Sequence, residues 1–307
     1  MMYLILIAGF VLLIKGADFF VEGSSAAAKI LKVPPLIIGL TVVSMGTSLP
    51  EASVSISASL AGKNELAVSN AVGSNIFNLM IVCGVCAAIC PIAINKDTLK
   101  RDFPISIAAV GLLMGLGALG FSVGHLDGVI LLAVFAGFLY LMVASAKKAR
   151  QEAEDEYKAM PVWKLLLFVI GGAAAIVVGG KMVVSGASDI ASAFGMTENL
   201  IGMTIVAFGT SLPELVTSVV AARKKEVDMA VGNVVGSNIF NILFVLGAAA
   251  AISPIVFSME NIIDTAVLIV MTAIVMAMCF KKKKLSRLHG LIMIGLYAVY
   301  TTYIFMR

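Results

Sequence analysis

The sequence predicts an all-α membrane protein of ten transmembrane helices, in two inverted five-helix repeats with broken helices at the midplane. Three observations predict this fold: an apolar composition, an internal repeat, and basic residues confined to alternate loops. Of the 307 residues, 60% are hydrophobic and 13% are charged, whereas soluble domains are about a quarter charged. The composition argues against a water-soluble enzyme, and a net charge of +4 spread over short loops argues against nucleic acid as a partner.

The helices follow from the apolar runs, because about 20 apolar residues span a bilayer at a rise of 1.5 Å per residue. The first half predicts helices at 1–20, 35–61, 66–89, 103–121 and 129–146. The second half predicts helices at 162–182, 200–222, 229–252, 265–280 and 288–305. The first run has no basic leader, so we expect a membrane helix there and not a cleavable signal.

Basic residues orient these helices, because the loops richest in lysine and arginine face the cytoplasm. This rule predicts a multi-pass protein of the cell membrane with both termini extracellular. The chain then divides into a first repeat at 1–146, a cytoplasmic linker at 147–163 and a second repeat at 164–307. The acidic linker is interpreted as a solvated connector, with a regulatory cation site as the alternative. The basic loops contain Lys96, Lys100 and Arg101; Lys147, Lys148 and Arg150; Arg223, Lys224 and Lys225; and Lys281 to Lys284 with Arg287.

An internal repeat is the strongest pattern in the chain. Residues 39–84 and 202–247 align without a gap at a constant offset of 163, and about half of the positions are identical. A unit of five helices places its second copy on the opposite side of the membrane from the first. Two such copies are related by a pseudo-two-fold axis in the membrane plane, which is a common plan of secondary transporters.

Each copy contains the sequence GTSLPE in the middle of an apolar run, ending at Glu51 and at Glu214. Proline lacks an N–H and glycine adds freedom, so both helices should break there and free several carbonyl groups. A carboxylate at that depth costs several kcal/mol and indicates function. Two such carboxylates repel each other unless a cation or a proton lies between them.

Further polar residues share faces with these glutamates at helical spacing. Ser, Thr and Asn side chains with free carbonyls form an all-oxygen shell, which Ca²⁺ and Na⁺ prefer, whereas Zn²⁺ and Cu⁺ favour His or Cys. Asn70 and Asn233 fit helix packing as well as they fit ion binding. The stripes are Ser44, Ser48, Glu51 and Ser55; Ala207, Ser211, Glu214 and Ser218; Asn70, Ser74 and Asn78; and Asn233, Ser237 and Asn241.

Other chemistry finds less support. The pair Cys83 and Cys86 has redox spacing, but it lies inside an apolar run, so we interpret both as small packing residues. A serine hydrolase would need a base near Ser48 or Ser211, and neither His125 nor His289 lies close in sequence. We therefore predict no enzyme activity and no cofactor.

The duplicated GTSLPE and GSNIFN motifs identify a resemblance that covers essentially the whole chain. The chain resembles the sodium/calcium exchangers of the Ca²⁺/cation antiporter superfamily, prokaryotic branch. The resemblance implies Na⁺-coupled Ca²⁺ transport by alternating access, with the first and sixth helices sliding against a fixed core. It also implies an exchange of about three Na⁺ for each Ca²⁺, which is electrogenic. We expect a monomer whose partners are these ions and the lipid bilayer.

The resemblance also implies roles for individual residues. Glu51 and Glu214 are similar to the central Ca²⁺ carboxylates, with the carbonyls of Thr47 and Thr210 completing that site and Asn78 and Asn241 facing it. An outer Na⁺ site is similar to Ala207, Thr210, Ser211, Glu51 and Ser74. An inner Na⁺ site is similar to Ser44, Thr47, Ser48, Glu214 and Ser237.

Two positions depart from the family pattern. Several members carry Asp where Asn241 stands, and an acid there accompanies K⁺ transport in the K⁺-dependent branch, so we expect K⁺ independence. Ser44 stands where Ala is common, which changes little if only its carbonyl binds. The alternatives that stay open are a K⁺-dependent Na⁺/Ca²⁺ exchanger, an H⁺/Ca²⁺ exchanger and, more remotely, a cation channel.

Overall fold

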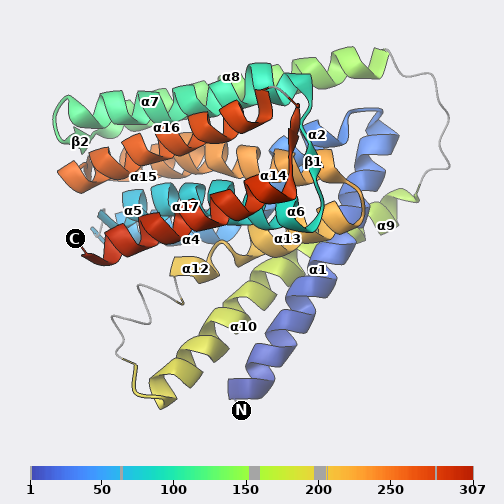
Figure 1. Ribbon diagram of the computed structural model, residues 1–307, viewed down its shortest axis with the longest axis horizontal. Helices are drawn as coiled ribbons and strands as arrows, with labels where there is room; N and C mark the ends of the chain where they lie inside the picture. Colours follow the sequence, from blue (N-terminus) through green and yellow to red (C-terminus); the bar gives the residue numbers. More distant parts are fainter. Residues whose placement is uncertain are drawn as a thin grey trace.

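The computed structural model describes residues 2–62, 65–151, 160–196, 205, 207–280 and 282–306, and it is almost entirely helical (Figure 1). Among these residues, eight helices are long and apolar enough to cross a membrane, and the bent pair Pro35–Thr47 and Leu49–Leu60 makes a ninth span if counted as one. The all-α membrane class is therefore confirmed. The predicted helix 200–222 lies partly outside the described residues.

The first half contains α-helices interrupted by π-helical turns, which are labelled η. Its helices are α1 (Met2–Leu31), α2 (Pro35–Ile38), η1 (Gly39–Val43), α3 (Ser44–Thr47), α4 (Leu49–Leu60), α5 (Glu65–Phe77), η2 (Asn78–Val82), α6 (Cys83–Ile89), η3 (Thr98–Asp102), α7 (Phe103–Ala118) and α8 (His125–Gln151).

The described part of the second half has a similar order, except that α9, η4 and α10 stand where α1 is one continuous helix and that no π-turn precedes α16. Its helices are α9 (Val162–Leu166), η4 (Leu167–Gly171), α10 (Gly172–Ala193), α12 (Ala207–Gly209), α13 (Leu212–Arg223), α14 (Val227–Phe240), η6 (Asn241–Val245), α15 (Leu246–Ile252), α16 (Met259–Phe280) and α17 (Arg287–Met306).

Several predicted helix ends are wrong because polar and small residues continue the helices. Helix α1 runs to Leu31 and not to residue 20, and the α9–η4–α10 run ends at Ala193 and not at 182. The added part of α1 contains buried Gly, Ser and Ala residues and packs on α9 and η4, so it needs no long apolar run. Helix α8 reaches Gln151, so the start of the expected linker is helical, while residues 152–159 lie outside the described part.

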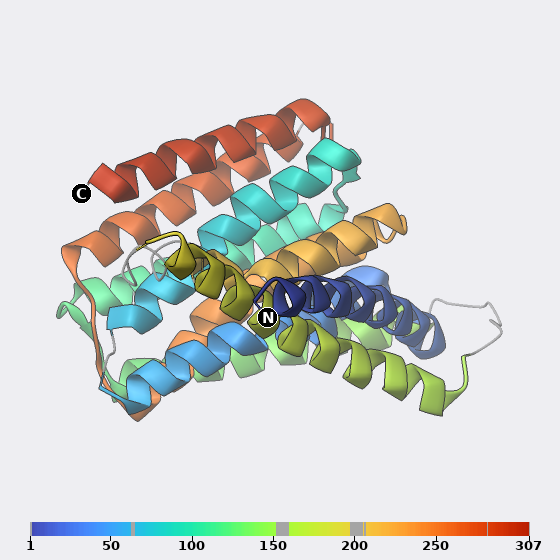
Figure 2. The ribbon, with the colours of Figure 1, turned by 90° about the horizontal axis from the view of Figure 1, so that it is seen from below.

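Helices α1 and α10 form a long pair that crosses the rest of the bundle obliquely (Figures 1 and 2). Small residues bring their backbones together, as is usual between membrane helices. A Cβ atom at Gly179 would lie 2.6 Å from the backbone nitrogen of Leu13, so only glycine fits at this contact. The pair therefore packs main chain against main chain.

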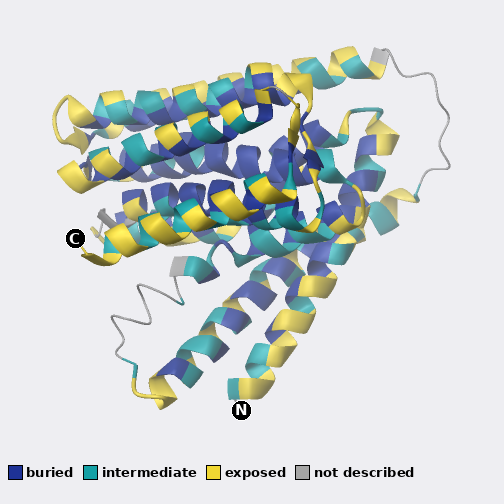
Figure 3. Cartoon of the chain, viewed as in Figure 1, coloured by how far each residue is buried: buried dark blue, intermediate teal, exposed yellow. Residues whose placement is uncertain are grey.

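The centre of the molecule is formed by two long equivalent runs, α5–η2–α6 and α14–η6–α15 (Figure 3). These are the two most buried of the candidate spans, whereas α17 and the α9–α10 run contain few buried residues. Both π-turns, η2 and η6, begin at the last Asn of the GSNIFN motif, at Asn78 and Asn241. π-turns in α-helices are frequent at functional sites.

Two short antiparallel ribbons, which the apolar runs did not predict, join the halves of the chain. Strand β1 (Ile92–Ala93) pairs with β4 (Lys284–Leu285), and β2 (Ser122–Val123) pairs with β3 (Ile255–Val256). With the offset of 163, β1 corresponds to β3. Each ribbon thus connects a loop of one half to a loop of the other half.

Candidate cation site

The helix break predicted in the first GTSLPE motif is confirmed. Ser48 leaves helical geometry at φ −85° and ψ 10°, and α3 and α4 meet there with a bend of 50°. Ser211 has nearly the same conformation, φ −93° and ψ 6°, immediately before α13. Pro50 and Pro213 stand in the first turns that follow, where each lacks the N–H that would continue the preceding helix.

Glu51 and Glu214 follow directly after the two breaks, and both are fully buried. Each accepts a hydrogen bond from the serine of the other half: Ser211 Oγ donates to Glu51 Oε1 at 3.1 Å, and Ser48 Oγ donates to Glu214 Oε1 at 2.8 Å. The two copies of the GTSLPE motif therefore meet at one place in the fold. The shared-face argument treated Ser48 and Glu51 as parts of one continuous helix, and the break at Ser48 interrupts that helix.

The other oxygen of each carboxylate, Oε2, is buried and has no hydrogen-bond partner among the described residues. The Oδ1 atoms of Asn78 and Asn241 are also buried and without a partner there. A buried acceptor without a partner is costly, and it therefore calls for an explanation. Carboxylate and amide oxygens are ligands that hard cations such as Ca²⁺ and Na⁺ prefer.

Hydroxyl groups complete the surroundings. Thr47 Oγ1 lies 3.1 Å from the backbone oxygen of Val43 and 3.0 Å from Asn233 Oδ1, and its single hydrogen is donated to one of these acceptors at a time. Ser237 Oγ approaches the backbone oxygen of Ser44 at 3.5 Å. None of these hydrogen bonds involves the backbone carbonyl oxygen of Thr47, which is one of the predicted Ca²⁺ ligands. Ten of the twelve predicted ligands are buried: Ser44, Thr47, Ser48, Glu51, Ser74, Asn78, Ser211, Glu214, Ser237 and Asn241.

The other two predicted ligands, Thr210 and Ala207, differ. Thr210 is partly exposed and lies in the turn before Ser211. Ala207 begins α12, and its side chain lies outside the described part of the structure. The roles of all twelve residues as ion ligands stay predictions.

Asn70 and Asn233 each join neighbouring helices, which agrees with the packing interpretation. Asn70 Nδ2 donates to Ser55 Oγ at 3.0 Å, and Asn233 Nδ2 donates to Ser218 Oγ at 2.9 Å. The two bonds are equivalent under the offset of 163. They tie α5 to α4 and α14 to α13, beside the carboxylates.

Asn75 and Asn238 are polar residues of the centre that the sequence patterns did not single out. Asn75 Nδ2 donates to the backbone oxygen of Asn238 at 2.9 Å, and Asn238 Nδ2 donates to the backbone oxygen of Asn75 at 3.2 Å. A spacing of four residues selects one face of each helix, and Asn75 and Asn238 do not belong to that series. Their presence in both GSNIFN motifs was the available signal.

The described residues contain no group of three or more His, Cys, Asp or Glu side chains that could hold a metal ion. Cys83 and Cys86 are free and buried within α6, in agreement with a packing role. His125 Nδ1 lies 2.9 Å from the Ala251 oxygen, and the Ser286 N–H donates to His289 Nδ1, so these contacts of the two rings are with groups other than Ser48 and Ser211.

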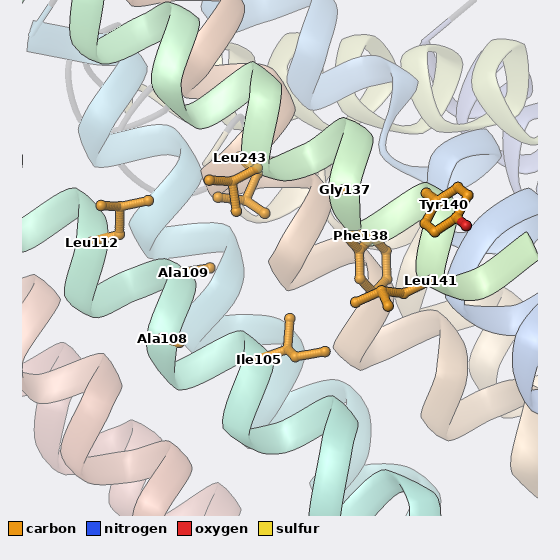
Figure 4. Close-up of a pocket in the computed structure, with 10 residues that line it drawn as sticks. Ile105, Ala108, Ala109, Leu112, Gly137, Phe138, Tyr140, Leu141 and Leu243 are labelled. Atoms are coloured by element: carbon orange, nitrogen blue, oxygen red, sulfur yellow. The ribbon is translucent and has the colours of Figure 1, made fainter. Parts of the chain in front are cut away.

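A separate cavity of about 570 Å³ lies between α7 and α8 (Figure 4). Its lining is apolar except for the Tyr140 hydroxyl, and it includes Gly137 of α8 and Leu243 of η6. None of the twelve predicted ligands lines it. It is therefore unsuited to a hydrated cation and is distinct from the carboxylate site.

Removing either cross-half serine should weaken ion binding without abolishing it. We expect Ser48→Ala and Ser211→Ala each to raise the half-saturating Na⁺ concentration about tenfold, since one donor to a buried carboxylate and one predicted oxygen ligand are lost. The measurement is the Na⁺ dependence of Ca²⁺ flux in proteoliposomes. Ser53→Ala is the matched control, because Ser53 is exposed on the same helix as Glu51; an equal effect there would contradict the assignment.

Comparison with known proteins identifies the family of the chain. The family model "Sodium/calcium exchanger protein" matches residues 1–144 and 164–306. The protein named as putative antiporter CaxA of Alkalimonas amylolytica is 42% identical, with 92% of this chain and 91% of the relative covered. The sodium/calcium exchanger MaX1 of Methanosarcina acetivorans is 31% identical, with 99% and 98% covered.

The fold agrees as well. The structure of the sodium-calcium exchanger NCX_Mj, soaked with Na⁺ and Sr²⁺, matches with a TM-score of 0.87 at 34% identity. The match covers 98% of this chain and 99% of the other. The family model, the relatives and the solved structure each match nearly the full length of the chain. The chain therefore belongs to the sodium/calcium exchanger family of cation antiporters.

Proposed function

We propose that the protein exchanges Na⁺ for Ca²⁺ across the cell membrane by alternating access, with Glu51 and Glu214 as the central ligands. The observation that carries the proposal is the pair of buried carboxylates, each held by the serine of the other half and each left with one oxygen that has no partner among the described residues. The proposed layout is ten helices in two inverted repeats, 1–146 and 164–307, joined by a cytoplasmic linker. The termini are extracellular, and the protein works as a monomer.

Charge balance supports obligatory exchange. The ionised pair carries two negative charges. One Ca²⁺ or two Na⁺ bring the net charge of the site to zero, and three Na⁺ bring it to +1. An empty site leaves buried charge that costs several kcal/mol, so the empty carrier changes faces slowly. With about three Na⁺ per Ca²⁺ one net charge crosses in each cycle, which couples transport to voltage at about 2.3 kcal/mol per 100 mV.

The two ends of the site differ in exposure, which supports an outward-facing assignment for this conformation. Asn70 and Thr210 are partly exposed, whereas their counterparts Asn233 and Thr47 are fully buried. The positive-inside rule places Asn70 on the extracellular side of the carboxylates. On the cytoplasmic side, Lys224 Nζ lies 2.6 Å from Asp18 Oδ1 of α1 and joins α1 to the end of α13.

The test is ⁴⁵Ca²⁺ uptake by proteoliposomes loaded with Na⁺ and diluted into Na⁺-free medium. We expect uptake that needs the Na⁺ gradient and is unchanged by K⁺ or a protonophore. Uptake should also increase when the vesicle interior is made positive, because one net positive charge leaves the vesicle in each cycle. Empty liposomes are the control. Uptake that requires K⁺ would instead indicate a K⁺-dependent Na⁺/Ca²⁺ exchanger, and uptake that follows a pH gradient would indicate an H⁺/Ca²⁺ exchanger. Ca²⁺ flux without a counter-ion would indicate a channel.

A further inference from the structure

The four asparagines at the centre have symmetric positions in the sequence but asymmetric hydrogen bonds. Asn75 corresponds to Asn238 and Asn78 corresponds to Asn241, both with the offset of 163. All four are buried, with exposed fractions of 0% for three of them and 3% for Asn238. They occupy the last turns of α5 and α14 and the starts of η2 and η6.

One set of bonds respects the symmetry. The amides of Asn75 and Asn238 each donate to the backbone oxygen of the other, at 2.9 and 3.2 Å. Each amide thereby connects the turn that precedes one π-helix to the equivalent turn of the other half. These reciprocal bonds hold the two central runs in register next to the carboxylates.

A second bond breaks the symmetry. Asn241 Nδ2 donates to Asn75 Oδ1 at 3.1 Å. The equivalent bond would run from Asn78 Nδ2 to Asn238 Oδ1, but these atoms are both buried and without a partner among the described residues. One central amide is therefore docked on the opposite half, and its counterpart is not.

The mirror arrangement, with Asn78 docked on Asn238 and Asn241 released, uses the same types of bond. In a transporter with inverted repeats, the two facing states exchange the roles of the two halves. We propose that Asn75 and Asn238 are positioning residues of an amide switch: Asn75 holds Asn241 in one facing state, and Asn238 holds Asn78 in the other. This inference rests on the proposed alternating access.

The switch has a consequence for ion binding. A docked asparagine has its NH₂ group engaged and its side chain fixed, while a released asparagine turns to bring its oxygen to an ion. In each facing state, Ca²⁺ and Na⁺ therefore bind beside one fixed and one adaptable asparagine side chain. Asn78 and Asn241 exchange these two roles when the carrier changes faces. Asn75 and Asn238 act through Asn241 and Asn78 and need not contact the ion themselves.

The test is a matched pair of variants in the full-length protein, Asn75→Ala and Asn238→Ala. Both lose one of the two reciprocal bonds to a backbone oxygen, so a purely structural effect is the same for both. Only Asn75→Ala removes the acceptor that Asn241 uses in this outward-facing conformation. The half-saturating Ca²⁺ concentration is measured at each face, in right-side-out and inside-out vesicles, and the readout is the ratio of the two values.

We expect Asn75→Ala to raise the outside-to-inside ratio about fivefold and Asn238→Ala to lower it about fivefold, the effect of one hydrogen bond on a two-state equilibrium. If either variant does not fold, Asn75→Ser and Asn238→Ser provide the same comparison with a smaller cavity. Equal shifts in one direction, or an unchanged ratio, would overturn the switch. Lack of Na⁺-driven Ca²⁺ uptake by the unmodified protein would instead overturn the proposed function.

Discussion

Glu51→Gln should abolish Na⁺-driven Ca²⁺ uptake, with a loss of about 100-fold or more. The substitution keeps the size and the hydrogen bond from Ser211, but it removes a negative charge from a fully buried site. The Oε2 atom of Glu51, which has no partner among the described residues, is a strong acceptor, and an amide oxygen is a weaker ligand for a divalent cation. Glu214→Gln should have the same effect, because its environment is equivalent.

The control for this experiment is Glu260→Gln, the same chemical change at an exposed position in the first turn of α16. We expect normal uptake from it. Uptake is measured with ⁴⁵Ca²⁺ in proteoliposomes that contain equal amounts of monodisperse protein, so that a folding defect is separated from loss of binding. Ordinary exchange by Glu51→Gln would disprove the site.

Gly236→Ala should damage both stability and transport, although it adds a single methyl group. A Cβ atom there would lie 2.6 Å from the backbone oxygen of Leu40 and 2.7 Å from Ser44 Oγ. Overpacking of this kind costs about 1–3 kcal/mol, and relief requires α14 to move away from η1 and α3. Since Ser44 is next to Ser237 in the site, we expect about tenfold slower exchange and a lower melting temperature.

Gly137→Ala provides the contrast. Gly137 lies in the middle of α8 and lines the apolar cavity (Figure 4). Apart from its chain neighbours and the adjacent backbone of its own helix, no atom lies within 4 Å of the position that the new methyl group would take. Alanine has a higher helix propensity than glycine by about 1 kcal/mol, so this variant should be as stable as the parent or more so. If Gly236→Ala also left the melting temperature and the exchange rate unchanged, the close contact between α14 and η1 would be disproved.

The features that the sequence predicted correctly are those that arise from local chemistry or from simple repetition. The break at Ser48 follows from Gly46 and Pro50 in one apolar run, and any chain with this pattern would have to bend there. The burial of Glu51 and Glu214 follows from their place in the middle of such runs. The constant offset then predicts that whatever surrounds one glutamate also surrounds the other.

The features that the sequence did not predict depend on contacts between distant segments. The end of α1 at Leu31 depends on packing against α9 and η4, which no local pattern reveals. The π-turns at Asn78 and Asn241 lie in ordinary apolar runs. The two-residue strands are too short for alternation to be visible, and their pairing joins the two halves.

The crossed hydrogen bonds of the two glutamates have an evolutionary consequence. Ser48 donates a hydrogen bond to Glu214, and Ser211 donates one to Glu51, so each carboxylate depends on a serine from the other half. Either half by itself therefore lacks the donor that its own glutamate uses. A substitution of one serine alters the hydrogen bonding of the glutamate in the other copy of the motif, which couples the two copies in evolution.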